Sequence, residues 1–235
     1  MSFSVRFINE SANISVVQFE KDGHLLFFAV EANGKDPKSF GPSCEVPTLL
    51  TDAMNICADV SDLMKMPHLM ADAVERVLTR RVQANNDSIA SVTYAGIAAN
   101  LGQIAVVTAG NLRIHLIQNR KLVETTRDHN LIDDPIAGAE VVLAGQLNEP
   151  IAESKFFHSI LTRQISYTDR GSHHEAEAKE WLVRGNFELL VTSIDAHRFR
   201  DPSEYLDEFY APLRSSGLVN LPVGGLVGLI TYEDD

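Results

Sequence analysis

A few groups of side chains in the sequence have the types and spacing that chemistry needs. Residues 173–177 read His-His-Glu-Ala-Glu, and imidazole and carboxylate groups both bind transition metals, although a solvated loop between strands explains the same pattern. Asp128 and His129 are adjacent and have the residue types of an acid–base pair, but we favour a structural role for both. The guanidinium of Arg6 matches a phosphate or sulfate oxyanion, and an ion pair with Glu31 or a similar acid is an equal alternative.

The charge of the chain narrows the classes of partner. Its 235 residues include 32 Asp plus Glu against 20 Lys plus Arg, so the formal net charge is −12. Nucleic acids and anionic membranes both need a basic face, so we expect neither and instead expect a protein partner. The many carboxylates leave metal chemistry open, and their positions must decide it.

The sequence also carries few features that would direct the chain elsewhere than the cytoplasm. The first ten residues lack the basic and apolar regions of a secretory signal. No window approaches the roughly 18 consecutive apolar residues of a membrane span. Cys44 and Cys57 are the only cysteines, too few for a disulfide framework. We therefore expect a cytoplasmic protein.

Apolar periodicity predicts strands at both ends of the chain. Residues 14–19 and 25–30 indicate a hairpin around the turn Lys21-Asp22-Gly23. From residue 89 onward the pattern predicts a β-meander of four strands, at 89–98, 104–108, 113–117 and 122–125. Further strands are expected at 156–167, 178–183, 187–192 and 226–232.

Helices are expected between these strands. Helical spacing or helix-start residues mark the segments 47–64, 68–83, 135–145 and 202–213. No internal repeat or low-complexity tract divides the chain. We therefore predict a single domain, residues 1–235, of two β-sheets covered by helices.

Two consecutive motifs point to a known family. Ala109-Gly110-Asn111-Leu112-Arg113 is followed, without a gap in spacing, by Thr126-Arg127-Asp128-His129. These segments resemble the G-D-S-R and T-x-D-H motifs of the type 2C metal-dependent protein phosphatases. Weaker similarities follow in family order, at residues 6–11 (R-x-x-N-E/Q-D), 27–34 (V-A-D-G), 91–93, 161–163, 189–193 (the strand into S-D-G) and 224–230 (D-N).

The resemblance implies a fold and an activity. The fold would be α+β, a four-layer α-β-β-α sandwich with two antiparallel sheets flanked by helices. The family hydrolyses phosphoserine and phosphothreonine with two Mg²⁺ or Mn²⁺ ions, while an arginine orients the phosphate. Hard divalent ions of this kind need converging oxygen ligands, which in the family are aspartates.

The sequence departs from the family at each of these aspartates. The four aligned metal positions are Ser11, Ala32, Ile194 and Gly224. Asn111 replaces the aspartate of G-D-S-R, and only Arg6 remains of the phosphate-handling set. Successive side chains of a strand point to opposite faces, so Glu10 and Glu31, each one position from a lost ligand, are expected to aim away. Asp195, which lies in a turn, is the better candidate substitute.

We therefore expect a catalytically inactive, phosphatase-like domain that acts as a regulatory module and binds a protein, including a phosphorylated one. This hypothesis assigns no catalytic residue, no metal and no cofactor, and it leaves Arg6 as the phosphate-binding residue. The alternative is a divergent phosphatase that holds Mg²⁺ or Mn²⁺ through Asp195, Glu31 or the terminal Glu233-Asp234-Asp235. A structural subunit of an oligomer, without a ligand, is a third possibility.

Overall fold

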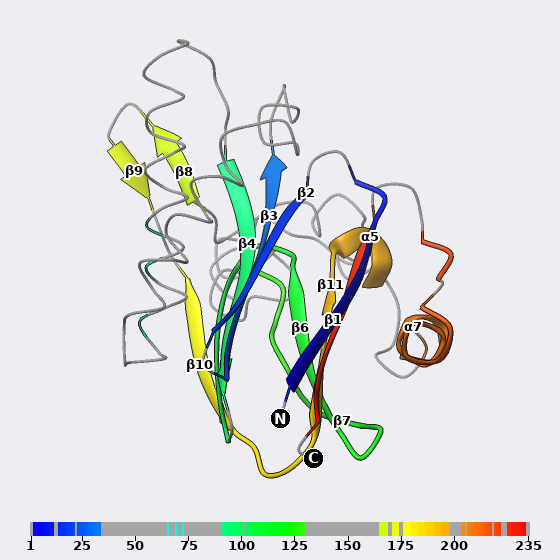
Figure 1. Cartoon of the computed structure of the whole chain (residues 1–235). Coiled ribbons are helices and arrows are strands. Elements are labelled where there is room, and N and C mark those ends of the chain that lie inside the picture. Colours follow the sequence, from blue (N-terminus) through cyan, green and yellow to red (C-terminus); the bar gives the residue numbers. More distant parts are fainter. Residues whose placement is uncertain are drawn as a thin grey trace, which may run out of the picture.

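The structure is a computed structural model (Figure 1). It describes residues 2–11, 14–21, 23–33, 91–100, 102–129, 165–168, 171–173, 176–197, 206–217, 219–221 and 225–233, and the isolated positions 65, 69, 72 and 204. The helices predicted at 47–64, 68–83 and 135–145 lie outside these ranges apart from isolated positions, and so does most of the strand predicted at 156–167.

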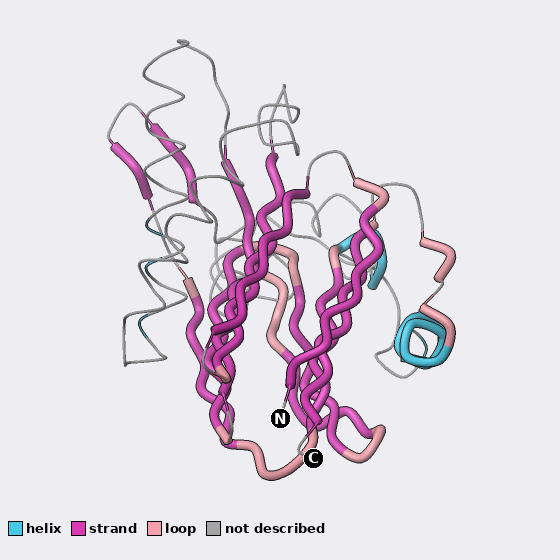
Figure 2. The backbone as a smooth tube through the Cα atoms, in the orientation of Figure 1, coloured by secondary structure: helices cyan, strands magenta, loops and turns pink. Residues whose placement is uncertain are grey.

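Two antiparallel sheets face each other, as the sequence predicts (Figure 2). Sheet A has the strand order β1-β12-β11-β6-β7. Its strands are β1 (Ser2–Asn9), β12 (Leu226–Glu233), β11 (Phe187–Thr192), β6 (Arg113–Gln118) and β7 (Lys121–Thr125). The first and last strands of the chain are paired, with Ser2 opposite Glu233, so the two chain ends lie together (Figure 1).

Sheet B has the order β10-β5-β4-β3-β2. Its strands are β10 (Glu177–Leu182), β5 (Gln103–Ala109), β4 (Ser91–Asn100), β3 (His24–Asn33) and β2 (Ile14–Lys21). The short strands β8 (Ile165–Thr168) and β9 (Gly171–His173) extend it, because β8 pairs with the start of β4. The predicted hairpin is confirmed as β2 and β3, and the chain turns between them at Gly23, whose φ is +75°.

The predicted four-strand meander is wrong. β4 and β5 pair in sheet B, whereas β6 and β7 pair in sheet A, so the chain crosses between the sheets after β5. Gly110 lies at this crossing with a φ of +96°, a conformation that a side chain strongly disfavours. Apolar periodicity is the same for a strand in either sheet, and it therefore does not reveal the crossing.

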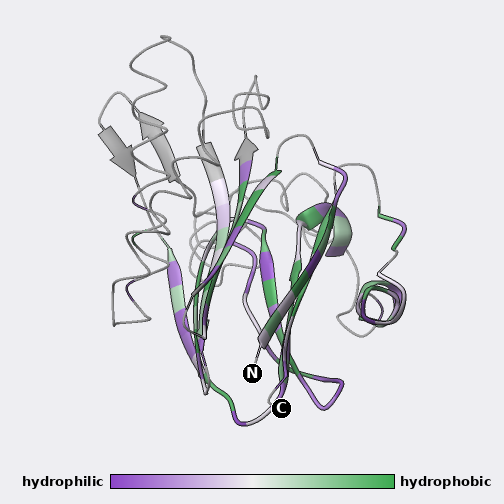
Figure 3. Ribbon diagram, viewed as in Figure 1, coloured by the Kyte–Doolittle hydropathy of each residue, from purple (hydrophilic) through white to green (hydrophobic). Residues whose placement is uncertain are grey.

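The main core fills the space between the sheets. Alternate residues of each strand face this space, such as Leu25, Phe27 and Ala29 of β3 and Leu189 and Val191 of β11. Figure 3 shows hydrophobic residues along the strands of both sheets, interrupted by hydrophilic bands on β6 and β10 among others. Burial of these apolar faces fixes the register of each strand, because a slip of one residue would expose its core face.

A second apolar cluster joins sheet A to the helical segments. These segments are α5 (Ile194–His197), the π-helix η3 (Leu206–Tyr210) and α7 (Ala211–Ser215). Phe209 and Leu213 pack onto Leu190 and Leu229 of sheet A. The helix predicted at 202–213 is thus present in part. No helix among the described residues is long and apolar enough to cross a membrane.

Candidate functional site

The candidate site lies at one end of the sandwich, here called the Glu31 end. β3 ends there, and Glu31 lies opposite Thr93 at the start of β4. In sheet A, the end of β1 lies beside the start of β12, since the Glu10 amide donates to the Gly225 carbonyl at 2.9 Å. Ser193 of the β11–α5 turn lies at the same place, because its amide donates to the Leu226 carbonyl at 3.0 Å and its hydroxyl accepts from the Leu226 amide at 2.9 Å.

Glu31 points into the space between the sheets. It follows Leu25, Phe27 and Ala29 in alternation, and all three belong to the intersheet core. Its Oε2 accepts a hydrogen bond from the Thr93 hydroxyl at 3.2 Å. The expectation that Glu31 aims away is therefore wrong. The expectation was based on the position of Glu31 next to Ala32, whereas the fold places Glu31 on the face toward the other sheet.

The surroundings of Glu31 disfavour its charge. Burial raises the pKa of this carboxyl, the hydrogen bond from Thr93 lowers it in part, and the charge of Asp195 raises it further, to about 7. A bound cation or a proton would relieve this cost, since either removes the uncompensated negative charge.

Asp195 is the second carboxylate at this end. It lies in the first turn of α5, immediately after the Ser193 turn, and its side chain is exposed. Its charge raises the pKa of Glu31, so these two carboxylates, which the alternative hypothesis assigns to a metal site, lie near each other. Among the described residues, however, no group of three or more His, Cys, Asp or Glu side chains could hold a metal ion.

The aligned metal positions occupy the Glu31 end as far as they are described. The Ser11 amide donates to the Asn9 side-chain oxygen at 3.0 Å, forming a local turn after β1. Ala32 follows Glu31 in β3, and Ile194 begins α5. Gly224 lies outside the described residues, although its neighbour Gly225 lies beside Glu10. Glu10 itself is exposed.

Glu233 lies at the opposite end of the molecule. It ends β12, which begins at Leu226, so roughly 23 Å of strand separates it from the Glu31 end at about 3.3 Å per residue. Glu233 therefore does not converge with Glu31 and Asp195, as ligands of one shared metal ion would have to. Asp234 and Asp235 lie outside the described residues.

A buried polar network lies beside the site. Arg113 donates two hydrogen bonds to Asp128, at 2.7 and 3.0 Å, and His197 of α5 contacts the same carboxylate through Nε2 at 3.1 Å. The network continues from His197 Nδ1 to the Thr192 hydroxyl at 2.9 Å, and from there to His115 at 3.1 Å. His197 thereby anchors α5, the helix that carries Asp195.

The charge of Asp128 is fully compensated in this network. Burial by itself raises the pKa of Asp128, but the charges and hydrogen bonds of His197 and Arg113 outweigh burial and lower the pKa to about 2. Burial also lowers the pKa of His115, so this ring is neutral at pH 7. Asp128, His197 and Thr192 resemble an acid–base–hydroxyl triad, but each is at most 1% exposed, so a substrate does not reach them.

His129 holds the crossing between the sheets. Its Nδ1 accepts from the Gly110 amide at 3.2 Å, its own amide donates to the Gly110 carbonyl at 2.9 Å, and its Nε2 contacts Glu177 at 2.9 Å. A Cβ at Gly110 would lie 2.1 Å from Thr93 Cγ2, which requires glycine at this position. These bonds support the structural role favoured for Asp128 and His129.

Within residues 173–177, His173 ends β9 and pairs with Ser166 of β8, and side-chain contacts are described for Glu177. Burial raises its pKa, but hydrogen bonds from His129 and Lys179 outweigh burial and lower it. Glu177, which lies on β10, therefore already forms ion pairs with His129 and Lys179. His174 and Glu175 lie outside the described residues.

Arg6 lies on the outer face of sheet A, where the helical segments pack. Its Nη1 donates to the carbonyls of Leu213 and Arg214, at 3.4 and 3.3 Å. Its cross-strand partner Leu229 belongs to the cluster between sheet A and the helical segments. The structure therefore does not bring Arg6 together with Glu31, and the alternative ion pair between them is absent from the described contacts.

Comparisons with known proteins match this fold over the full chain. The Streptococcus agalactiae (S. agalactiae) serine/threonine phosphatase matches with a TM-score of 0.66 and 16% identity, covering 99% of this chain and 100% of that one. PppA, a key regulatory component of T6SS in Pseudomonas aeruginosa, matches with a TM-score of 0.68 and 17% identity, covering 99% and 98%. The catalytic domain of PstP in complex with two manganese ions matches with a TM-score of 0.65 and 13% identity, covering 99% and 98%.

No family model matches the sequence, and no curated protein does. The fold is nevertheless that of the bacterial type 2C serine/threonine phosphatases, by structural similarity along the whole chain at low sequence identity. Similarity at this level of identity establishes the fold and leaves the chemistry to the residues of the site.

Proposed function

We propose that this chain is a phosphatase-like domain that does not hydrolyse phosphoesters and that acts as a regulatory module by binding a phosphorylated protein. The observation that carries the proposal is the charge set at the Glu31 end. In the part of the chain that the structure describes, Glu31 and Asp195 are the carboxylates at or beside the aligned metal positions that interact there. Two metal ions that share a bridging water need more carboxylates than these two.

The regulatory role is supported by the composition and by a structural relative. An acidic chain with a net charge of −12 suits a protein partner better than a nucleic acid or an anionic membrane surface. PppA, which has the same fold, is named as a regulatory component. On this proposal the domain uses no cofactor.

A second candidate function is a divergent phosphatase with Mg²⁺ or Mn²⁺ at the Glu31 end. The observation in its favour is the orientation of Glu31, which points between the sheets, and its interaction with Asp195. PstP, of the same fold, holds two manganese ions. Glu31 would lose its unfavourable charge on binding such an ion.

Phosphatase assays decide between the two candidates. The full chain is incubated with p-nitrophenyl phosphate and with a phosphothreonine peptide across a manganese series. We expect no metal-dependent turnover. Turnover that rises with manganese and is lost in Glu31→Gln, but kept in Glu124→Gln on the exposed part of β7, would establish the second candidate and contradict the first.

Binding is tested separately. The chain is titrated with a phosphothreonine peptide and with the same peptide unphosphorylated, by calorimetry without added metal. Tighter binding of the phosphorylated peptide supports the proposal. Equal binding of both peptides would remove the phosphorylated partner from it.

A further inference from the structure

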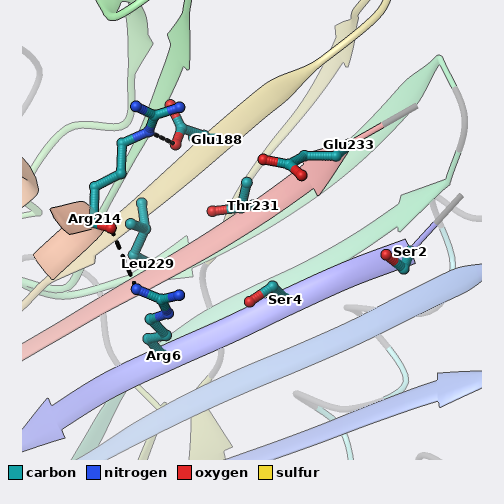
Figure 4. Close-up of a pocket in the computed structure, with 8 residues that line it drawn as sticks. All are labelled: Ser2, Ser4, Arg6, Glu188, Arg214, Leu229, Thr231 and Glu233. Carbon is teal, nitrogen blue, oxygen red and sulfur yellow. Dashed lines mark hydrogen bonds and ion pairs between the residues drawn. The ribbon is translucent and has the colours of Figure 1, made fainter. Parts of the chain in front are cut away.

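A pocket of about 250 Å³ opens on the outer face of sheet A, away from the Glu31 end (Figure 4). It lies over β1, β12 and β11, and the end of α7 borders it. Antiparallel register puts Ser4 beside Thr231, and Thr231 beside Glu188. A row of polar side chains therefore forms the floor of a face that is otherwise apolar near α7.

Arg6 borders this floor on β1. Its Nη1 donates to the Leu213 and Arg214 carbonyls, at 3.4 and 3.3 Å, which orients the guanidinium toward the end of α7. Figure 4 shows its other nitrogens on the side of Ser4. A planar guanidinium that is oriented in this way binds oxyanions well, because its donors match their geometry and part of its conformational freedom is already lost.

Arg214 borders the floor on the other side. Its Nε donates to Glu188 Oε1 at 2.7 Å, and the Tyr210 hydroxyl donates to the other oxygen of Glu188. The charge of Glu188 is thereby compensated within the protein. The Arg214 side chain remains 41% exposed, with its terminal nitrogens beyond the ion pair.

The spacing of the two arginines suits one small anion. Arg6 stands on β1 and Arg214 is held over β11, two strands away, which corresponds to about 10 Å at roughly 4.8 Å per strand. An anion above Thr231, on the strand between them, would lie near both guanidinium groups. The hydroxyls of Ser4 and Thr231 add donors from below.

We propose that this pocket binds a phosphate monoester, with its phosphoryl group above Thr231 between Arg6 and Arg214. A phosphoryl group offers three terminal oxygens, which match several guanidinium and hydroxyl donors better than the two oxygens of a carboxylate. The pocket exceeds the volume of a phosphate ion and leaves room for the group that carries it. The phosphorylated partner of the proposed function is one source of this ester, so the inference rests on that function and locates its binding site.

Glu233 limits the affinity of the pocket. It lines the same pocket in the row beyond Thr231, opposite Ser2. Its negative charge opposes an anion, and its removal is expected to strengthen binding. Substitutions of different residues that line this pocket are therefore expected to change its affinity for an anion in opposite directions.

The experiment titrates the full chain with inorganic phosphate and with a phosphothreonine peptide, followed by calorimetry. We expect Arg6→Gln to weaken binding of the peptide roughly tenfold, as for a lost charge-assisted hydrogen bond. Thr231→Val keeps the strand and should weaken binding about threefold, whereas Glu233→Gln should tighten it about threefold. Arg184→Gln, an exposed arginine of the β10–β11 turn, is the matched control and should leave binding unchanged.

The titrations distinguish the two sources of the phosphoryl group, a phosphorylated protein and free inorganic phosphate. Peptide binding that follows the variants, tighter than that of inorganic phosphate, assigns the pocket to a phosphorylated chain. Inorganic phosphate binding that follows the variants without peptide binding supports the pocket and overturns the phosphoprotein partner. Peptide binding that is equal in all variants would overturn the pocket while the proposed function stands.

Discussion

Two carboxylates near the same end of the sandwich, the buried Asp128 and the half-buried Glu31, have opposite electrostatics. Asp128 accepts hydrogen bonds from Arg113 and His197, and its pKa falls to about 2. Glu31 has Thr93 as its hydrogen-bond donor and the negative Asp195 nearby, and its pKa rises to about 7. Burial raises the pKa of both groups, so their partners make the difference.

The contrast between Asp128 and Glu31 distinguishes a carboxylate that stabilises the fold from one that does not. A carboxylate whose charge is compensated inside the protein stabilises the fold and has little to offer a ligand. A carboxylate whose charge is not compensated costs stability, and such groups are found preferentially at functional sites. Protonation of Glu31 removes its uncompensated charge, whereas Asp128 keeps its charge and supports the elements around it.

Replacement of Asp128 should have the largest effect. Asp128→Asn leaves Arg113 and His197 beside a neutral group, and the loss of one partner of a buried ion pair costs about 3–5 kcal/mol. Urea unfolding at pH 7 measures it. Asp207→Asn, on the exposed side of η3, is the control and should cost less than about 0.5 kcal/mol. Equal effects of the two changes would contradict the role of Asp128.

Replacement of Glu31 should act in the opposite direction and depend on pH. Because the folded pKa of about 7 exceeds the ordinary value of 4.5, this carboxyl contributes most to stability below pH 4.5, and its contribution falls as the pH rises to 7. Glu31→Gln should therefore gain up to about 3 kcal/mol relative to the parent chain between pH 4 and pH 8. Urea unfolding at both pH values measures the gain. A constant difference between the two chains would refute the raised pKa.

Replacement of His197 should have an intermediate effect. His197→Gln cannot reproduce both ring contacts, with Asp128 and Thr192, so a buried polar group loses a partner at a cost of about 1–3 kcal/mol. The double variant with Asp128→Asn should cost less than the sum of the single variants, because the two residues are in contact. Simple additivity in urea unfolding would show that the network does not couple them.

Metal addition should have the smallest effect. Millimolar Mg²⁺ or Mn²⁺ is expected to leave the melting temperature unchanged at pH 7.5, because an ion that binds the native state must stabilise it and we propose that none binds. A rise of several degrees, absent from Glu31→Gln, would instead establish the metal-dependent candidate and make Glu31 a ligand. Calorimetric melting with each salt provides the measurement.

Much of the fold follows from local patterns. The strands β2, β3, β5, β6, β10, β11 and β12 begin and end within a few residues of their predicted bounds, because each alternates or is continuously apolar. The pairing of β5 with β4 and of β6 with β7 is also local. The change of sheet at Gly110 is not, since it depends on what each strand packs against.

Less of the candidate site than of the fold could be predicted from the sequence. The motif around residues 27–34 located the strand end, but an offset of one residue placed Glu31 on the wrong face, and a strand with a period of two tolerates no such error. Arg6 was associated with the site by its spacing from Ser11, whereas the fold holds it against α7 on the outer face. His197 was missed, because its contact with Asp128 spans 69 positions of the chain.

The sequence by itself determined the strand pattern, the acidic charge and the absence of aspartate at four aligned positions. Tertiary structure alone decided which carboxylates are compensated, because Arg113 and His197 reach Asp128 only after β6, α5 and the loop after β7 have packed together. It also decided that the charge of Asp195 acts on Glu31 and that Arg6 donates to the Arg214 carbonyl. The physical reason is that a charge is stabilised or destabilised by neighbours in space, and these neighbours come from distant parts of the chain.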